Sequence, residues 1–197
     1  MSIPKIIHYC WFGGKPLPKS CKKLITTWEK HLPDYELRFW DEESFDVHSS
    51  EFVRAAYQAG VAFSKSYVGY VHAVAHSLGG AYGIPHGLAN AVLLPHVLFA
   101  YGKRVEKKLH RLASAAGIAT AGDTPKEAAE RLISEIFRMN REMQIPATLQ
   151  GIVAEDIPAL ARRAEKEANP LYPVPKLLTA KELERFYYAV SEQQSHV

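Results

Sequence analysis

The chain has 197 residues, of which 47% are hydrophobic and 23% are charged, and its formal net charge is +3. This is the composition of a soluble globular protein with room for one ordinary domain or two small ones. The basic clusters at 19–23 and 103–111 contain no interleaved aromatic residues that could stack on bases. We therefore expect solvated helix faces there and no nucleic-acid partner.

The cysteine count and the apolar stretches predict a cytoplasmic protein. Cys10 and Cys21 form neither a C-x-x-C motif nor a disulfide framework, which favours a reducing compartment. The start of the chain lacks the pattern of a signal peptide. The longest apolar stretch, 88–101, contains Asn90, Pro95 and His96 and is too short and too polar to cross a bilayer. We expect no membrane partner.

Residues 1–59 are predicted to open like an α/β sheet. Residues 3–12 are rich in β-branched and aromatic side chains and stop at two glycines, which is typical of a strand and a turn. Residues 19–31 have helical spacing, 35–40 alternate like a second strand, and 50–59 indicate a short helix. The order is β-α-β-α.

Residues 60–197 are predicted to form an all-helical bundle. Apolar helices are expected over 61–78 and 87–101, separated by a glycine-rich turn at 79–85, and a further helix over 103–115. Thr124 and Thr179 each open a capping-box pattern, predicting helices to about residues 143 and 191, and an alanine-rich helix is expected over 154–168. The predicted fold class is mainly α, a helical bundle preceded by a short β-α-β-α fragment.

Three histidines near the turn are the strongest chemical signal. His72 and His76 are four residues apart and share one helix face, and His86 follows the glycine-rich turn. A chain that folds back at this turn brings His86 near His72. Imidazoles gathered in this way indicate a divalent-metal site or proton chemistry, while a hydrogen-bonded core role is the alternative for each ring.

The stretches around these histidines closely resemble the iron-containing (group III) alcohol dehydrogenases. The resemblance covers about residues 60–197. It rests on G-Y-V-H-A-V-A-H-S-L-G-G at 69–80, I-P-H-G-L-A-N-A-V-L-L-P-H-V at 84–97, E-D-I-P at 155–158 and A-N-P-L-Y-P-V-P-K at 168–176. It implies an all-helical C-terminal domain of a dehydrogenase.

The resemblance also implies roles for individual residues. His72 and His86 match two of four metal ligands, with Fe²⁺ or Zn²⁺ as the metal. His76 matches a residue beside the nicotinamide that takes part in proton handling, and Phe63 matches one that packs near the nicotinamide ring. The implied reaction is interconversion of a small primary alcohol and an aldehyde with NAD(P). The sequence leaves open whether the chain forms a homo-oligomer.

Parts of that family's machinery have no counterpart in residues 1–59. The family's other two metal ligands, an Asp and a His four residues later, are not found there. Gly13-Gly14 is not followed by the G-x-G-x-x-G pattern of a dinucleotide site. Two imidazoles without a carboxylate are expected to bind metal weakly, and the chain is expected to be inactive by itself.

Residues 1–59 look like the start of a family-32-type capsular polysaccharide glycosyltransferase. The resemblance rests on I-P-K-I-I-H-Y-C-W-F-G-G at 3–14, L-P-D-Y-E at 32–36 and W-D at 40–41. It implies that Tyr9, Trp11, Gly13 and Gly14 touch a nucleotide-sugar. Such enzymes hold a divalent cation with a D-x-D pair, and the sequence contains none, which favours a bare β-α-β piece over a working transferase.

The sequence therefore predicts two fragments, 1–59 and 60–197, joined abruptly. The leading hypothesis is a truncated or fused iron-containing alcohol dehydrogenase. A nucleotide-sugar transferase and a non-catalytic metal-binding helical module are the alternatives. Since the bundle lacks a partner domain over its histidine face, we also expect His72, His76 and His86 to line an open, partly solvated cleft.

Overall fold

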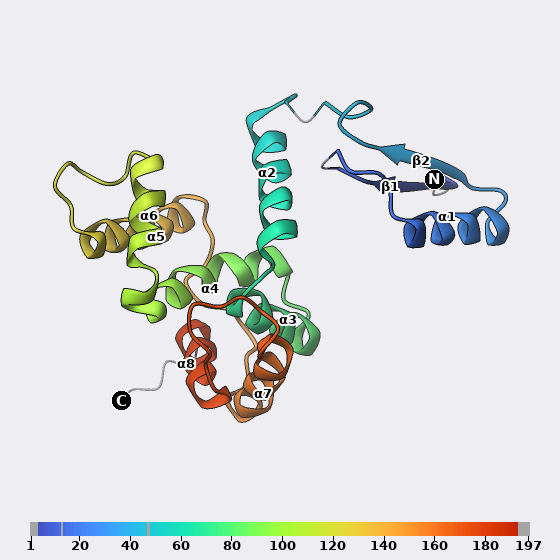
Figure 1. Ribbon diagram of the computed structural model, residues 1–197. Coiled ribbons are helices and arrows are strands. Elements are labelled where there is room, and N and C mark those ends of the chain that lie inside the picture. Colours follow the sequence, from blue (N-terminus) through green and yellow to red (C-terminus); the bar gives the residue numbers. More distant parts are fainter. Residues whose placement is uncertain (1–3, 13, 47, 193–197) are drawn as a thin grey trace. The chain divides into compact units, whose positions relative to one another are not determined.

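The computed structural model describes residues 4–12, 14–46 and 48–192. The chain divides into two compact units, Met1–Ser66 and Tyr67–Val197. The described part of the first unit has the order β-α-β-α, and that of the second contains helices without a named strand. The predicted mainly helical fold class is confirmed (Figure 1).

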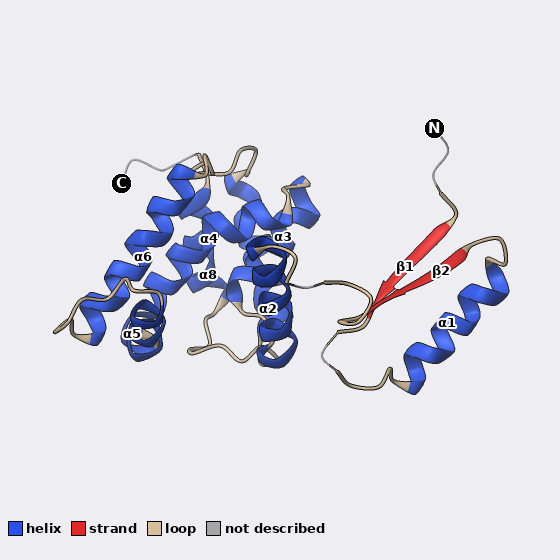
Figure 2. Cartoon of the chain, turned by 90° about the horizontal axis from the view of Figure 1, so that it is seen from above, coloured by secondary structure: helices blue, strands red, loops and turns tan. Residues whose placement is uncertain are grey.

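The first unit is built on a two-stranded parallel sheet. Strand β1 (Ile6–Cys10) pairs with β2 (Glu36–Trp40), and helix α1 (Lys19–His31) makes the crossover between them (Figure 2). The register places Tyr9 opposite Phe39, whose ring centroid lies 5.2 Å away. Tyr9 also meets Trp28 of α1 edge to face at 6.1 Å. Aromatic contacts thus join the helix to one side of the sheet.

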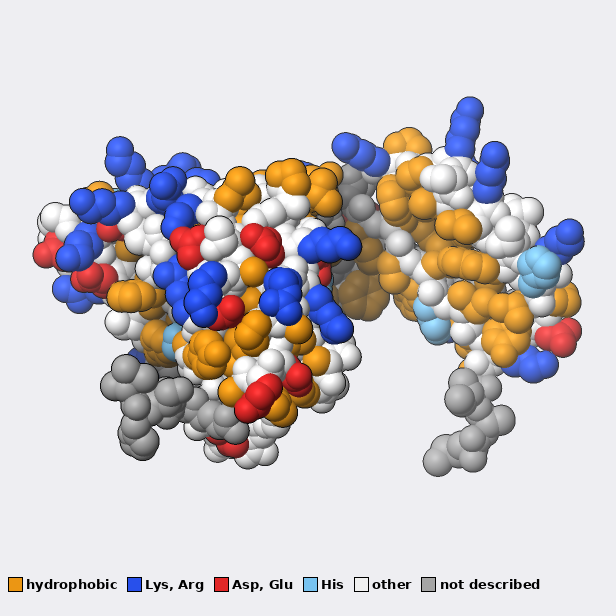
Figure 3. All heavy atoms as spheres, turned by 90° about the horizontal axis from the view of Figure 1, so that it is seen from below, with side chains coloured by type: hydrophobic (Ala, Val, Ile, Leu, Met, Phe, Trp, Pro, Cys, Tyr) orange, Lys and Arg blue, Asp and Glu red, His pale blue; other side chains and the backbone are white. Residues whose placement is uncertain are grey.

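The first unit has no fully buried core. Helix α2 (Glu51–Ser66) completes it, and none of the described residues up to Ser66 is buried. Hydrophobic side chains cover much of the face of this unit seen in Figure 3. Two parallel strands with so little cover contribute little stability by themselves. The stable core of the chain lies in the second unit.

Four helices enclose the main core of the second unit. They are α3 (Tyr70–Tyr82), α4 (His86–Tyr101), α7 (Ile157–Ala168) and α8 (Ala180–Val190). Helix α3 packs on both α4 and α7, and α7 packs on α8. The core includes the fully buried side chains of Leu78, Leu93, Ile157, Leu183 and Tyr187. This packing fixes the spacing of α3, α4 and α7, which carry the candidate site.

A second, smaller hydrophobic cluster joins the remaining helices. Helix α5 (Glu106–Ala115) packs on α6 (Pro125–Glu142) through Val105, Leu109, Ala129 and Ile133. Two short 3₁₀ turns, η1 (Gly102–Arg104) and η2 (Ala154–Asp156), precede α5 and α7. The α5–α6 pair therefore forms a subsidiary layer connected to the main core through α4.

A proline inside α4 shapes this connection. Pro95 is buried in the middle of the helix, and it has no N–H to donate to the carbonyl of Ala91 four residues earlier. The side-chain amide of Asn140 in α6 donates to that carbonyl oxygen at 2.8 Å. A backbone acceptor left free by the proline is thus satisfied from the neighbouring helix.

The capping boxes predicted at Thr124 and Thr179 are both present. In each, the threonine hydroxyl accepts from the backbone N–H of the glutamate three residues on, and that glutamate accepts from the threonine backbone N–H. Lys176 donates to Glu182 at 2.6 Å. This bond, followed by the capping bonds, lowers the pKa of Glu182 to about 2. The helix starts are therefore fixed locally, as the sequence predicts.

The prediction of one continuous helix over 61–78 is wrong. Helix α2 ends at Ser66 and α3 begins at Tyr70. Tyr67 between them has a φ of +59°, in the left-handed region that ends helices. Gly69 is extended, and its carbonyl accepts from the N–H groups of His72 and Ala73. Apolar periodicity continues across this break, which is why it did not mark the boundary.

The predicted turn at 79–85 is shorter than expected. Gly79 and Gly80 are helical, α3 extends to Tyr82, and the chain reverses at Gly83, which has a φ of +68° and donates to the Gly79 carbonyl. A Cβ atom on Gly79 would lie 3.4 Å from the carbonyl oxygen of Ile84. Gly79 therefore permits a close approach of the turn to the helix, and His86 starts α4 directly after it.

No helix in the described ranges is both long and apolar enough to cross a membrane.

Candidate functional site

The structure brings the three predicted histidines together at the junction of α3 and α4. The ring centroid of His86 lies 5.4 Å from that of His72 and 5.1 Å from that of His76, and the last two rings are 6.0 Å apart. His76 and His86 stack with an interplanar angle of 20°. One helical turn of α3 supplies two of the rings, and the reversal at Gly83 supplies the third.

All three rings have access to solvent. His72 is partly buried, while His76 and His86 are exposed. Burial lowers the pKa of His72, and repulsion from His86 and His76 lowers it further, against a smaller opposing effect of Glu167. The cluster therefore disfavours a charged imidazole at His72, which leaves a neutral ring with a lone pair to offer.

A carboxylate from another helix contacts the cluster. Glu167, near the end of α7, has its Oε1 atom 2.7 Å from Nδ1 of His76. The same oxygen accepts from the hydroxyl of Tyr172 at 2.7 Å. Burial raises the pKa of Tyr172 to about 12, with added contributions from the hydrogen bond and charge of Glu167. His76, Glu167 and Tyr172 thus form a hydrogen-bonded chain that runs from α3 to the segment after α7.

Asn90 contacts the third histidine. Its Nδ2 atom lies 2.8 Å from Nε2 of His86, one helical turn earlier in α4. Its Oδ1 atom is buried and has no hydrogen-bond partner among the described residues. Asn90 thus holds the ring of His86 and keeps one buried acceptor beside it.

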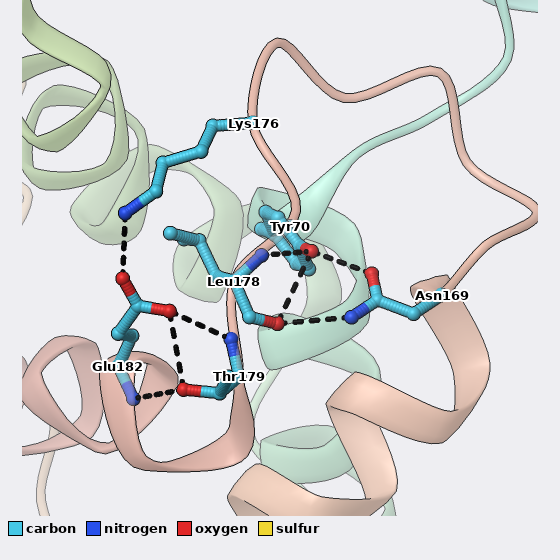
Figure 4. Close-up of polar contacts among 6 residues, drawn as sticks. All are labelled: Tyr70, Asn169, Lys176, Leu178, Thr179 and Glu182. Carbon is cyan, nitrogen blue, oxygen red and sulfur yellow. Dashed lines mark hydrogen bonds and ion pairs between the residues drawn. The ribbon is translucent and has the colours of Figure 1, made fainter.

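A buried network fixes the segment that carries Tyr172. The Tyr70 hydroxyl donates to Oδ1 of Asn169 at 2.5 Å and accepts from the backbone N–H of Leu178 at 2.8 Å, and the Asn169 amide donates to the Leu178 carbonyl at 2.9 Å (Figure 4). Tyr70 is fully buried at the first turn of α3. Both ends of 169–178 are thereby tied to the helix that carries His72 and His76.

The donor groups fit part of a metal site and not a whole one. His72 and His86 could each offer an imidazole nitrogen, but His76 is bonded to Glu167 and His86 to Asn90. Within residues 4–12, 14–46 and 48–192, no three His, Cys, Asp or Glu side chains are arranged to hold a metal ion. Protein sites for Zn²⁺ or Fe²⁺ use three or four such donors. The described residues therefore supply an incomplete donor set.

The other predicted site residues lie in the first unit. Phe63 is on α2 with 57% of its surface exposed, and its place near a nicotinamide stays a prediction. Tyr9 and Trp11 are half-buried at and just after β1. Gly14 has a φ of +65°, and Gly13 lies outside the described residues.

Sequence reasoning missed Glu167, Tyr172 and Asn90. Glu167 and Tyr172 lie about ninety residues beyond His76, so no local spacing connects them to it. The signal that could have found Asn90 is its i,i+4 spacing from His86 on one helix face. An acidic residue near the end of α7 carries no such signal, because only the packing of α3 on α7 brings it to the site.

Comparisons with known proteins match this chain to a family. The family described as Fe-containing alcohol dehydrogenase family, C-terminal, matches residues 35–190. Lactaldehyde reductase from Escherichia coli K12 is 40% identical over 116 residues, which are 58% of this chain and 30% of that protein. Alcohol dehydrogenase 4 from Schizosaccharomyces pombe is 34% identical over 172 residues, 84% of this chain and 39% of that protein.

A solved structure gives the same result. Alcohol dehydrogenase from Oenococcus oeni matches with a TM-score of 0.66 and 28% identity, over 86% of this chain and 44% of that one. The chain therefore belongs to the Fe-containing alcohol dehydrogenase family, and it corresponds to the C-terminal part of that family. It spans about 30% of the length of the relative from Escherichia coli.

Proposed function

We propose that this chain provides the helical, metal-facing part of an enzyme that interconverts small primary alcohols and aldehydes with NAD(P). The observation that supports this most directly is the set of three imidazoles, with centroids within 6.0 Å of one another, in a member of the Fe-containing alcohol dehydrogenase family. The cytoplasmic location predicted from the sequence is part of this proposal.

In this proposal, His72 and His86 are two of the ligands of an Fe²⁺ or Zn²⁺ ion. A bound metal of this kind supplies Lewis-acid polarisation of the alcohol or carbonyl oxygen. His76 handles the proton, and Phe63 packs near the nicotinamide ring. The lowered pKa of His72 supports its role, because a metal ligand must be a neutral imidazole.

We further propose that the chain by itself turns over no alcohol. The two donors it offers are short of the three or four of a working site. Residues 1–59 contain neither a matching Asp and His pair nor a dinucleotide-binding glycine pattern. A second copy of residues 1–197 would lack the same groups, so a homo-oligomer, which the sequence leaves open, would not complete the site by itself.

A calorimetric titration with Zn²⁺ tests the metal-facing role. We expect weak binding of Zn²⁺ by the purified chain. His72→Ala or His86→Ala should weaken it by at least about tenfold, because even the loss of a residue that only supports a ligand typically costs that much metal affinity. His110→Ala, on α5 away from the cluster, is the matched control and should bind as the unsubstituted chain does. Equal binding by all four proteins would contradict the assignment of ligands.

The same preparations separate the enzyme from a non-catalytic metal-binding module. Under the enzyme proposal, NADH forms from 1,3-propanediol only when a polypeptide that carries the missing metal ligands and the dinucleotide-binding part is added. This activity should be lost in His72→Ala. Metal held through dialysis together with no turnover under any of these conditions would favour the module.

A second proposal concerns residues 1–59, which we infer descend from a nucleotide-sugar transferase. The parallel β1–α1–β2 arrangement supports it, as does a groove of about 940 Å³ lined by Trp11, Phe12, Tyr57 and others after the carboxyl end of β1. Ligands of open α/β sheets bind at that end. A junction after residue 59 has no such support, because α2 runs across that position and the dehydrogenase family match already begins at residue 35.

Calorimetry with UDP tests this second proposal. Binding by the full chain that is lost in Trp11→Ala and kept in His31→Ala, at the end of α1, would support a retained nucleotide site. Absence of any heat of binding to the unsubstituted chain would remove the transferase hypothesis.

A further inference from the structure

We propose that Glu167 is a positioning residue that holds His76 in the tautomer with hydrogen on Nδ1 and so reserves Nε2 as the acceptor of the ring. The use of that acceptor in proton handling rests on the proposed function. The tautomer itself does not, because it follows from the hydrogen bond between α3 and α7.

The geometry determines the direction of this bond. Oε1 of Glu167 lies 2.7 Å from Nδ1 of His76. An ionised carboxylate can only accept, so Nδ1 must carry the hydrogen. In a neutral imidazole the other nitrogen then has the free lone pair. The His76 and Glu167 side chains are 43% and 34% exposed, so this bond has to compete with water.

Tyr172 helps the His76–Glu167 hydrogen bond to compete with water. Its hydroxyl donates to the same Oε1 atom of Glu167 at 2.7 Å, which restricts the rotation of the carboxylate. The backbone N–H of Tyr172 donates to the Ala168 carbonyl, and the Tyr70–Asn169–Leu178 network fixes the surrounding segment. Glu167 is therefore held from two sides in the orientation that faces His76.

The tautomer determines which ring nitrogen of His76 can accept a proton. With hydrogen on Nδ1, Nε2 can accept a proton from a hydroxyl group. With hydrogen on Nε2, that nitrogen could only donate. The accepting nitrogen would then be Nδ1, which faces Glu167 and not a substrate. Holding a histidine in one tautomer through its second nitrogen is a general way to prepare it for proton transfer.

Nuclear magnetic resonance of ¹⁵N-histidine-labelled full chain tests the proposal without metal, cofactor or turnover. Two-bond ¹H–¹⁵N couplings, recorded at a pH where the spectrum shows the neutral ring, distinguish the tautomers. We expect the Nδ1–H form of His76 to exceed the Nε2–H form by about tenfold or more, given the strength of hydrogen bonds to charged acceptors.

Three variants make the experiment decisive. Glu167→Ala should return His76 to a mixture of tautomers, and Tyr172→Phe should shift it part of the way. Glu165→Ala, two residues earlier on α7, is the matched control and should leave the tautomer unchanged. An Nε2–H form in the unsubstituted chain, or an unchanged ratio in Glu167→Ala with native circular dichroism, would overturn the proposal. Neither result would bear on whether His72 and His86 bind metal.

Discussion

Substitution of Leu78 by alanine should lower the free energy of unfolding by about 2–5 kcal/mol, the range for truncating a fully buried leucine. Leu78 is 0% exposed on α3 and belongs to the main core formed by α3, α4, α7 and α8. The removed atoms lose their apolar contacts, and the well-packed helices around them cannot close the cavity fully. Urea denaturation followed by far-UV circular dichroism measures the change.

Leu112→Ala is the matched control for this experiment. Leu112 lies on α5 in the same unit and is 58% exposed, so the same truncation there should change the free energy of unfolding by no more than about 0.5 kcal/mol. If the two variants had equal stability, Leu78 would not lie in a packed core, and the arrangement of α3 against α7 would be wrong.

Tyr70→Phe should destabilise the chain by about 1–3 kcal/mol, although it removes a single oxygen atom. The lost hydroxyl leaves the buried backbone N–H of Leu178 and the partly buried Oδ1 of Asn169 without their partner. The ring itself still fills its space, so the cost comes from unsatisfied polar groups and not from a cavity. The same urea titration reports it.

Tyr67→Phe removes the same atom from a tyrosine that is 72% exposed, three residues earlier. Its stability should stay within about 0.5 kcal/mol of the unsubstituted chain. Tyr70→Phe should in addition shift the tautomer ratio of His76 toward a mixture, because the segment carrying Tyr172 loses its anchor. A Tyr70→Phe protein as stable as Tyr67→Phe would show that the network in Figure 4 contributes nothing.

Local signals predicted much of this fold. The patterns at Thr124 and Thr179 predicted two helix starts correctly, because a capping box is formed by residues three apart and needs no tertiary partner. Helix α1 was expected over 19–31 and occupies Lys19–His31. The gathering of His72, His76 and His86 was also predicted, since four-residue spacing and one reversal are enough to bring the rings together.

Features that depend on packing could not be predicted in this way. The break at Tyr67 interrupts a stretch whose apolar pattern is continuous, and a left-handed tyrosine has no signature in sequence. The turn predicted over 79–85 includes Gly83, where the chain reverses, but Gly79 and Gly80 belong to α3. The contact of Glu167 with His76 joins helices ninety residues apart, so it exists only once α7 lies against α3.

The proline within α4 has a consequence for how the subsidiary layer is placed. The apolar side chains of α4 and α6 that pack against the smaller hydrophobic cluster, such as Leu98 and Phe137, attract their neighbours without a preferred register, so they would tolerate sliding of α6 along α4. The Ala91 carbonyl, which Pro95 leaves without an intrahelical donor, is a directional acceptor, and its bond to Asn140 favours one alignment of α6 on α4. Pro95, a residue type usually regarded as a helix breaker, thus helps to specify where along α4 the α5–α6 pair attaches.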